Sequence, residues 1–157
     1  MLFRSMDTIK LKGTYNFKIF REDGTLRDEF SVDNIVTNAG KAQIALLCGD
    51  ASATPFTYIA VGTSSTSPSV GQTTLGAEIT DTGLARSSGT VSRTTTTVTN
   101  DTFSITKTWT ASGVKAIEEV GIFNASSGGE MLSRALTGTK TTANGETIQA
   151  TYTLAFA

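Results

Sequence analysis

The chain has no histidine and only one cysteine among its 157 residues. Histidine is the commonest general base and the commonest metal ligand, so its absence excludes Ser–His and Cys–His nucleophile pairs. A single cysteine, Cys48, excludes an intrachain disulfide, and the disulfide framework of small secreted proteins is absent. The composition therefore favours a structural role over a catalytic one.

Charge and long apolar runs are scarce as well. Charged residues make up 17% of the chain, against an average of about 25%, and 13 Lys and Arg nearly balance 14 Asp and Glu. No basic block is present, so we expect no nucleic-acid partner. The longest apolar run, residues 44–48, is far shorter than the roughly 18 residues of a membrane helix, and residues 1–10 lack the apolar core of a secretory signal. We expect a soluble protein, made in a cytoplasm, whose charge-poor surface reflects either ordinary variation or cover by neighbouring subunits.

Most of the chain has the pattern of β-strands. Apolar and polar residues alternate with a period of two at residues 11–19, 26–32, 103–110 and 148–156. A nearly continuous apolar run at 58–62 predicts a strand covered on both faces, and weaker patterns predict strands at 84–99 (with a break near Gly89), 116–124 and 131–136. Asp23-Gly24 and Asn144-Gly145 predict tight turns. The total is about eight or nine strands.

One helix is predicted within residues 35–49. Thr37 or Asn38 is expected to cap its first turn, and Gly49 to end it in a left-handed conformation. Cys48 is expected to be a small buried hydrophobe. Four residues recur at the spacing of a single helix face that should lie on a sheet: Gly40, Ile44, Leu47 and Cys48.

These elements predict an all-β chain. We expect a single domain over residues 1–157 with an N-terminal arm at about residues 1–10, folded as an antiparallel β-sandwich of jelly-roll type with one short α-helix packed on it. A smaller barrel or an immunoglobulin-like sandwich is the alternative. Four aromatic residues are expected to carry much of the core: Phe17, Phe30, Trp109 and Phe123.

No catalytic, cofactor or metal site is predicted. Glu118 and Glu119 are adjacent carboxylates, but on a strand they point to opposite faces. One of them with Asp81 or Asp101 is a conceivable calcium site, although no calcium-loop spacing is present. The segments GTSSTS and NASSGG match neither a P-loop nor a dinucleotide fingerprint. We expect no enzyme, and a hydrolase built on two carboxylates is the distant alternative.

Four short motifs in succession carry a family resemblance. They are IVTNAG (with Val36, Thr37, Asn38 and Gly40), IAVGT (Ile59 to Thr63), TLGAE (with Thr74, Leu75 and Glu78) and EVGIFN (Glu119 to Asn124). The combination resembles a family of small virion proteins of tailed bacteriophages, with Ser64 and Ser65 standing where that family often has glycine. The resemblance implies head-decoration proteins or components associated with the tail and fibre, and no enzymatic activity.

The resemblance leads to a functional expectation. We expect a head decoration protein that is made in the host cytoplasm, resides in the virion and binds the major capsid protein or other virion proteins, without a cofactor or membrane contact. A homo-oligomer is expected, and a trimer fits because capsid lattices offer local three-fold axes. A tail-fibre, baseplate or receptor-binding component is the alternative. Two segments, the loop at 63–74 and the N-terminal segment at 1–12, are expected to make contacts, unless they are simply a floppy loop and a disordered terminus. The expected contact residues are Leu2, Phe3, Met6, Thr63, Ser64, Ser65, Pro68 and Val70.

Overall fold

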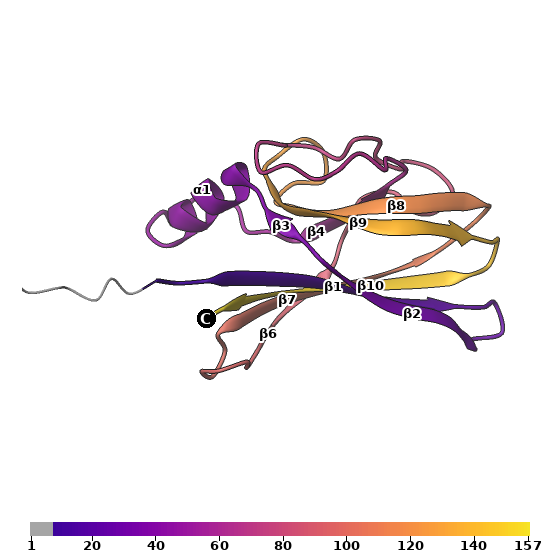
Figure 1. Ribbon diagram of the computed structural model, residues 1–157, viewed down its shortest axis with the longest axis horizontal. Coiled ribbons are helices and arrows are strands. Elements are labelled where there is room, and N and C mark those ends of the chain that lie inside the picture. The colour runs from indigo at the N-terminus through magenta and orange to yellow at the C-terminus, as the bar shows by residue number, and fades with distance from the viewer. Residues whose placement is uncertain (1–7) are drawn as a thin grey trace, which may run out of the picture.

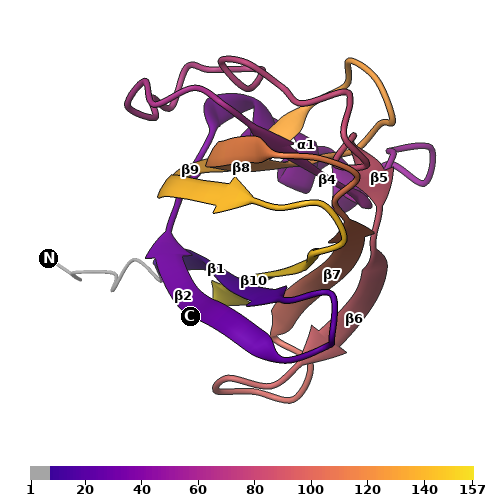
Figure 2. The ribbon, with the colours of Figure 1, turned by 90° about the vertical axis from the view of Figure 1, so that its right-hand side faces the viewer.

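The described part of the chain is a sandwich of two antiparallel sheets with one helix at one end (Figure 1, Figure 2). The computed structural model describes residues 8–157. Its elements in chain order are β1 (Leu11–Phe20), β2 (Leu26–Asp33), β3 (Ile35–Val36), α1 (Asn38–Leu47), β4 (Tyr58–Gly62), β5 (Ser87–Ser88), β6 (Thr90–Thr94), β7 (Thr102–Thr110), β8 (Lys115–Phe123), β9 (Met131–Thr142) and β10 (Thr147–Phe156). The predicted all-β sandwich is confirmed.

The first sheet has the strand order β2-β1-β10-β7-β6, and the second has the order β3-β9-β8-β4-β5. Neither order confirms the more specific prediction of a jelly roll. In the first sheet, the period-two pattern of β1 buries Tyr15, Phe17 and Ile19 against the second sheet. Gly24, with φ at 83°, closes the β1–β2 turn, as the Asp-Gly pair predicts.

Strand β4 of the second sheet is covered on both faces. Ile59 and Val61 of β4 belong to the core between the sheets, whereas Ala60 belongs to a small cluster on the outer face, where Leu75 covers it. Leu75 lies in the long connection between β4 and β5, which runs over the outer side of the sheet (Figure 2). The prediction of a strand covered on both faces is confirmed.

Thr37, one of the two predicted N-caps, caps the first turn of helix α1. The Thr37 hydroxyl accepts a hydrogen bond from the Gly40 amide at 2.9 Å and donates to the Met131 carbonyl. Gly40 rests directly on β9, because a Cβ at this position would lie 2.4 Å from the Leu132 carbonyl oxygen. Two residues three positions apart, Thr37 and Gly40, therefore cap the helix and dock its first turn on the sheet.

The predicted end of the helix is wrong. The backbone of Cys48 has right-handed helical dihedral angles. The Cys48 amide donates to the Ala45 carbonyl and the Gly49 amide donates to the Leu46 carbonyl, so the last turn closes with bonds between residues three apart and needs no left-handed residue. The predicted burial of the helix face is wrong at its end too, since Leu47 is 39% exposed and Cys48 is exposed. The reason is that α1 extends past the end of the sheets (Figure 1), so only its first turns rest on β9.

The aromatic core prediction holds at three of four positions. Phe17, Trp109 and Phe123 are buried, with exposures of 1%, 4% and 0%. Phe30 is only partly buried, because it lies on the edge strand β2. It nevertheless stacks on Phe17 with ring centroids 5.1 Å apart, and the two rings still form one unit.

Candidate interaction surface

A buried ion pair lies under the long connection between β4 and β5. Glu119 of β8 and Arg134 of β9 are both fully buried, and Arg134 Nε donates to Glu119 Oε2 at 2.7 Å. Neighbouring Glu118 is half-buried and accepts a hydrogen bond from the Thr139 hydroxyl instead. A buried charge pair is stable only when further hydrogen bonds satisfy both partners, so the surroundings of Glu119 and Arg134 are informative.

The Glu119 carboxylate accepts hydrogen bonds from both ends of a loop in the connection between β4 and β5. Its Oε1 accepts from the amides of Ser64 at 3.3 Å and Ala77 at 2.8 Å, and its Oε2 accepts from the Gly76 amide at 3.0 Å. A Cβ at Gly76 would lie 2.4 Å from the Ser64 hydroxyl oxygen, so the two ends approach too closely for a side chain there. We refer to residues 63–79 as the anchored loop.

Arg134 holds the middle of the anchored loop. Its Nη1 donates to the Gln72 side-chain oxygen at 3.0 Å, and the same oxygen accepts from the Ser69 amide at 2.8 Å. The Val70 carbonyl accepts from the Asn38 amide at 2.8 Å, which ties the loop to the first turn of α1. The loop is therefore fixed at its start, middle and end, which argues against the alternative of a floppy excursion.

A second arginine secures the segment that follows. Arg86 forms an ion pair with Glu78 through Nε at 2.9 Å, and it donates to the carbonyls of Ala125 and Gly128 at 3.1 and 2.8 Å. Its guanidinium carbon also lies 3.6 Å from the centre of the Phe123 ring, a favourable cation–π position. Arg86 thus joins the anchored loop to the turn at residues 124–129.

The predicted contact residues of this loop divide into two groups. Thr63, Ser65 and Val70 are exposed, whereas Ser64 and Pro68 are half-buried. The exposed side chains lie on a backbone that is hydrogen-bonded at several points, so the anchored loop presents a pre-shaped polar surface with one large exposed apolar residue, Val70. The other three predicted contact residues, Leu2, Phe3 and Met6, lie outside the described residues.

The two aspartates that were considered as calcium ligands, Asp81 and Asp101, each bind different groups of the protein. Asp101 accepts from the amides of residues 96, 97 and 98, each at 2.7 Å, and these bonds hold its pKa well below the usual range. Asp81 accepts from Lys115 Nζ at 2.8 Å, which lowers the pKa of Asp81. Over residues 8–157, no group of three potential metal-binding acidic or cysteine side chains comes together, and no helix is long and apolar enough to cross a membrane.

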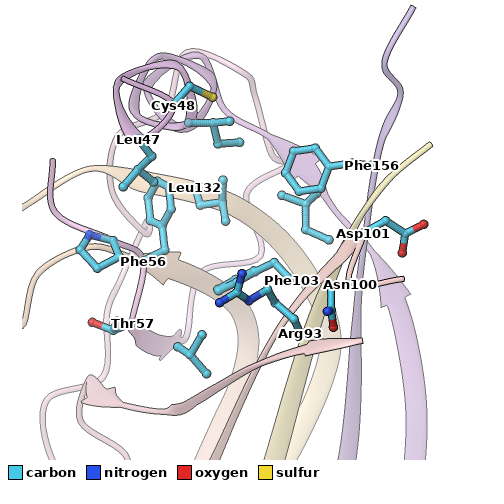
Figure 3. A pocket seen from close by; sticks show the side chains of 14 residues that line it. Leu47, Cys48, Phe56, Thr57, Arg93, Asn100, Asp101, Phe103, Leu132 and Phe156 are labelled. Atoms are coloured by element: carbon cyan, nitrogen blue, oxygen red, sulfur yellow. The ribbon is translucent and has the colours of Figure 1, made fainter. Parts of the chain in front are cut away.

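A second surface feature was missed by the sequence analysis. A groove of about 740 Å³ opens at the end of the sandwich between α1 and the first sheet (Figure 3), and we call it the end groove. Leu47 of α1 and Cys48, which directly follows the helix, lie on one side of it and Arg93 of β6 on the other. The remaining lining residues are Ile44, Pro55, Phe56, Thr57, Val91, Asn100, Asp101, Phe103, Leu132, Leu154 and Phe156. The signal in the sequence was the apolar end of the helix, which we interpreted as core.

Comparison with known proteins finds no family model, no curated protein and no solved structure that matches this chain.

Proposed function

We propose that this chain is a structural protein of a bacteriophage virion, and specifically a head decoration protein that binds the capsid lattice through the anchored loop. The observation that carries the proposal is the fixation of this loop by the buried Glu119–Arg134 pair. A contact surface that is already shaped before binding loses little conformational entropy on association. A rigid scaffold with a fixed loop suits a protein that must repeat the same contact at many positions.

The positions of the family motifs add support. Gly62, in the IAVGT motif, lies against Glu119, since a Cβ there would be 2.4 Å from Glu119 Oε1. Glu119 opens the EVGIFN motif, and its carboxylate binds the amides of Gly76 and Ala77 in the TLGAE motif. Three motifs that are far apart in the sequence therefore form one structural unit. This is expected if the resemblance reflects a shared scaffold for presenting the loop.

The composition of the exposed surface also fits a protein that is covered in an assembly. Charged residues are scarce in the whole chain, and the exposed part of the anchored loop is made of small polar residues around Val70, which is 47% exposed. Charge is depleted in the cores of protein interfaces. We propose the major capsid protein as the partner, with the decoration protein assembling as a homo-oligomer, for which a trimer matches the local three-fold axes of a capsid.

The copy number in the particle tests the proposal. Quantitative mass spectrometry of purified virions should give an amount of this protein that approaches that of the major capsid protein. A ratio of a few per cent or less would place the protein in the tail or fibre instead. Absence from particles would overturn the virion role itself.

A pair of variants tests the contact surface. Val70→Glu places a charge on the exposed loop, and Val114→Glu places the same charge on a residue that is 72% exposed and lies between β7 and β8. Each variant is added to particles that lack the protein, and the bound amount is measured. We expect Val70→Glu to bind at least about tenfold more weakly, the effect of about 1.4 kcal/mol, and Val114→Glu to bind normally. Equal binding of both variants would show that the anchored loop is not the contact surface.

A further inference from the structure

The two ends of the sandwich differ in how they are closed. At the end that carries the β9–β10 turn, Arg27 pairs with Glu146 at 2.9 Å and also donates to the Thr141 carbonyl at 3.0 Å, so polar contacts join the two sheets. At the other end lies the end groove, whose apolar walls include Val91 and Phe156, which are 45% and 37% exposed. An exposed apolar groove favours the binding of another apolar segment, because each Å² of apolar surface removed from water stabilises the bound state by roughly 25 cal/mol.

The described chain begins close to this groove. The Lys10 amide donates to the Ala157 carbonyl at 2.6 Å, and the Ala157 amide donates back to the Lys10 carbonyl at 2.9 Å. Ala157 directly follows Phe156, which lines the end groove. Residues 1–7 therefore join the described chain within a few residues of the groove.

The length of this segment matches the width of the groove. Seven residues span at most about 25 Å. The groove extends from β10 across β7 to β6, and the distance from β1 to β6 is three strand spacings, or about 14 Å. Residues 1–7 contain three large apolar side chains, Leu2, Phe3 and Met6.

We propose that the end groove is the docking site of residues 1–7 of the same chain, with Leu2, Phe3 and Met6 against its apolar walls. The direct covalent connection gives the segment a high effective concentration at its own groove, which favours it over the same segment of a second copy. This inference is independent of the proposed function.

Cys48 provides a built-in probe, because it lines the end groove, is exposed in the described structure and is the single cysteine of the chain. The rate at which its thiol reacts with a disulfide reagent is measured in the full chain and in the full-length variant L2S/F3S/M6S. A segment docked about 90% of the time slows the reaction roughly tenfold. We therefore expect the triple variant to react about ten times faster than the parent, while the distant variant Val114→Ser reacts at the parent rate.

A change on the groove side completes the test. Val91→Asp alters an exposed groove residue, so folding should be retained, as the melting temperature verifies. We expect this variant to match the faster rate of the triple variant. Equal rates in the parent and the triple variant, or an unchanged rate in Val91→Asp, would overturn the proposal. Protection of Cys48 that disappears on dilution would also overturn it, since that result would assign the groove to a second copy.

Discussion

Arg134 Nε lies 2.7 Å from Glu119 Oε2, and neither side chain has any exposed surface. The two residues belong to neighbouring strands, β9 and β8, so the sheet itself fixes their separation. Between them they bind the start, middle and end of the anchored loop. One ion pair in the sheet therefore binds a surface loop, residues 63–79, at three separate points.

Replacement of Arg134 by Met should destabilise the protein by about 3–5 kcal/mol, because Glu119 would remain as an unpaired buried charge. Urea unfolding at pH 7 measures the change in the free energy of unfolding. Arg93→Met is the matched control, since Arg93 is exposed and should change stability by less than about 0.5 kcal/mol. Similar losses in both variants would contradict the structural role of the Glu119–Arg134 pair.

The close approach at Gly76 gives a second prediction. In Gly76→Ala, the new Cβ would lie 2.4 Å from the Ser64 hydroxyl oxygen, so the ends of the anchored loop must separate, at a cost of roughly 1–3 kcal/mol. Gly71 is in the same loop, and a Cβ there meets nothing within 4 Å. Limited proteolysis should therefore cut the loop faster in Gly76→Ala and at the parent rate in Gly71→Ala. Equal cleavage of both variants would contradict the anchoring.

Much of the fold was predictable from the sequence because its signals are local. The alternation in β1 and β10 follows from one buried face, and the turns at Gly24 and Gly145 follow from residues that tolerate positive φ, which is 83° and 82° in the structure. Each of these predictions needs only a short window of residues.

The loop at 63–74 was predicted as a contact segment, but its anchoring and the end groove depend on contacts between distant residues, which explains why the sequence did not predict these two features. The Glu119–Arg134 pair needs the register of β8 and β9, and Gln72 reaches Arg134 across 62 positions of the chain. Leu47 has the spacing of a core residue, yet it is exposed because α1 runs past the end of the sheet. Helix periodicity shows which side chains share a face but not how far the supporting sheet extends.

Acidification should weaken the turn at residues 95–101. Backbone amides bind the ionised Asp101 and lower its pKa from the ordinary value of 3.8. This stabilisation is present above pH 3.8 and is lost as the pH falls toward the lower pKa of the folded state. Asp101→Asn removes the titrating group, so the melting temperature of this variant should lie below that of the parent at pH 7. The difference between the two melting temperatures should become smaller from pH 4 to pH 2.

A neutral change in the same turn serves as the control for Asp101. In Thr97→Ala, any difference in melting temperature from the parent should stay constant between pH 7 and pH 2, because no ionisable group is altered. A constant gap for Asp101→Asn over the same range would show that the amide contacts do not stabilise the charged form.

Alkaline conditions test the core between the two sheets. Tyr152 is fully buried and its ring centre lies 4.6 Å from that of Tyr15. Burial disfavours the phenolate and raises the pKa of Tyr152 to about 12, and it raises the pKa of Tyr15 as well. In the unfolded chain a tyrosine ionises near pH 10. The protein should keep its stability up to about pH 10 and lose it as the pH rises toward 12, because only the unfolded state then releases the proton.

Tyr152→Phe isolates this contribution. The variant should lose some stability at pH 7, because it loses the hydrogen bond that the Tyr152 hydroxyl accepts from the side-chain amide of Asn34, Nδ2, at 3.4 Å. Between pH 10 and pH 12, however, its free energy of unfolding should fall less than that of the parent, by an amount on the order of 2 kcal/mol. Phe17→Leu changes the same core without altering an ionisable group, so its stability curve should run parallel to that of the parent. Parallel curves for the parent and Tyr152→Phe would mean that the Tyr152 phenol is able to ionise within the folded protein, and hence that water reaches the space between the sheets.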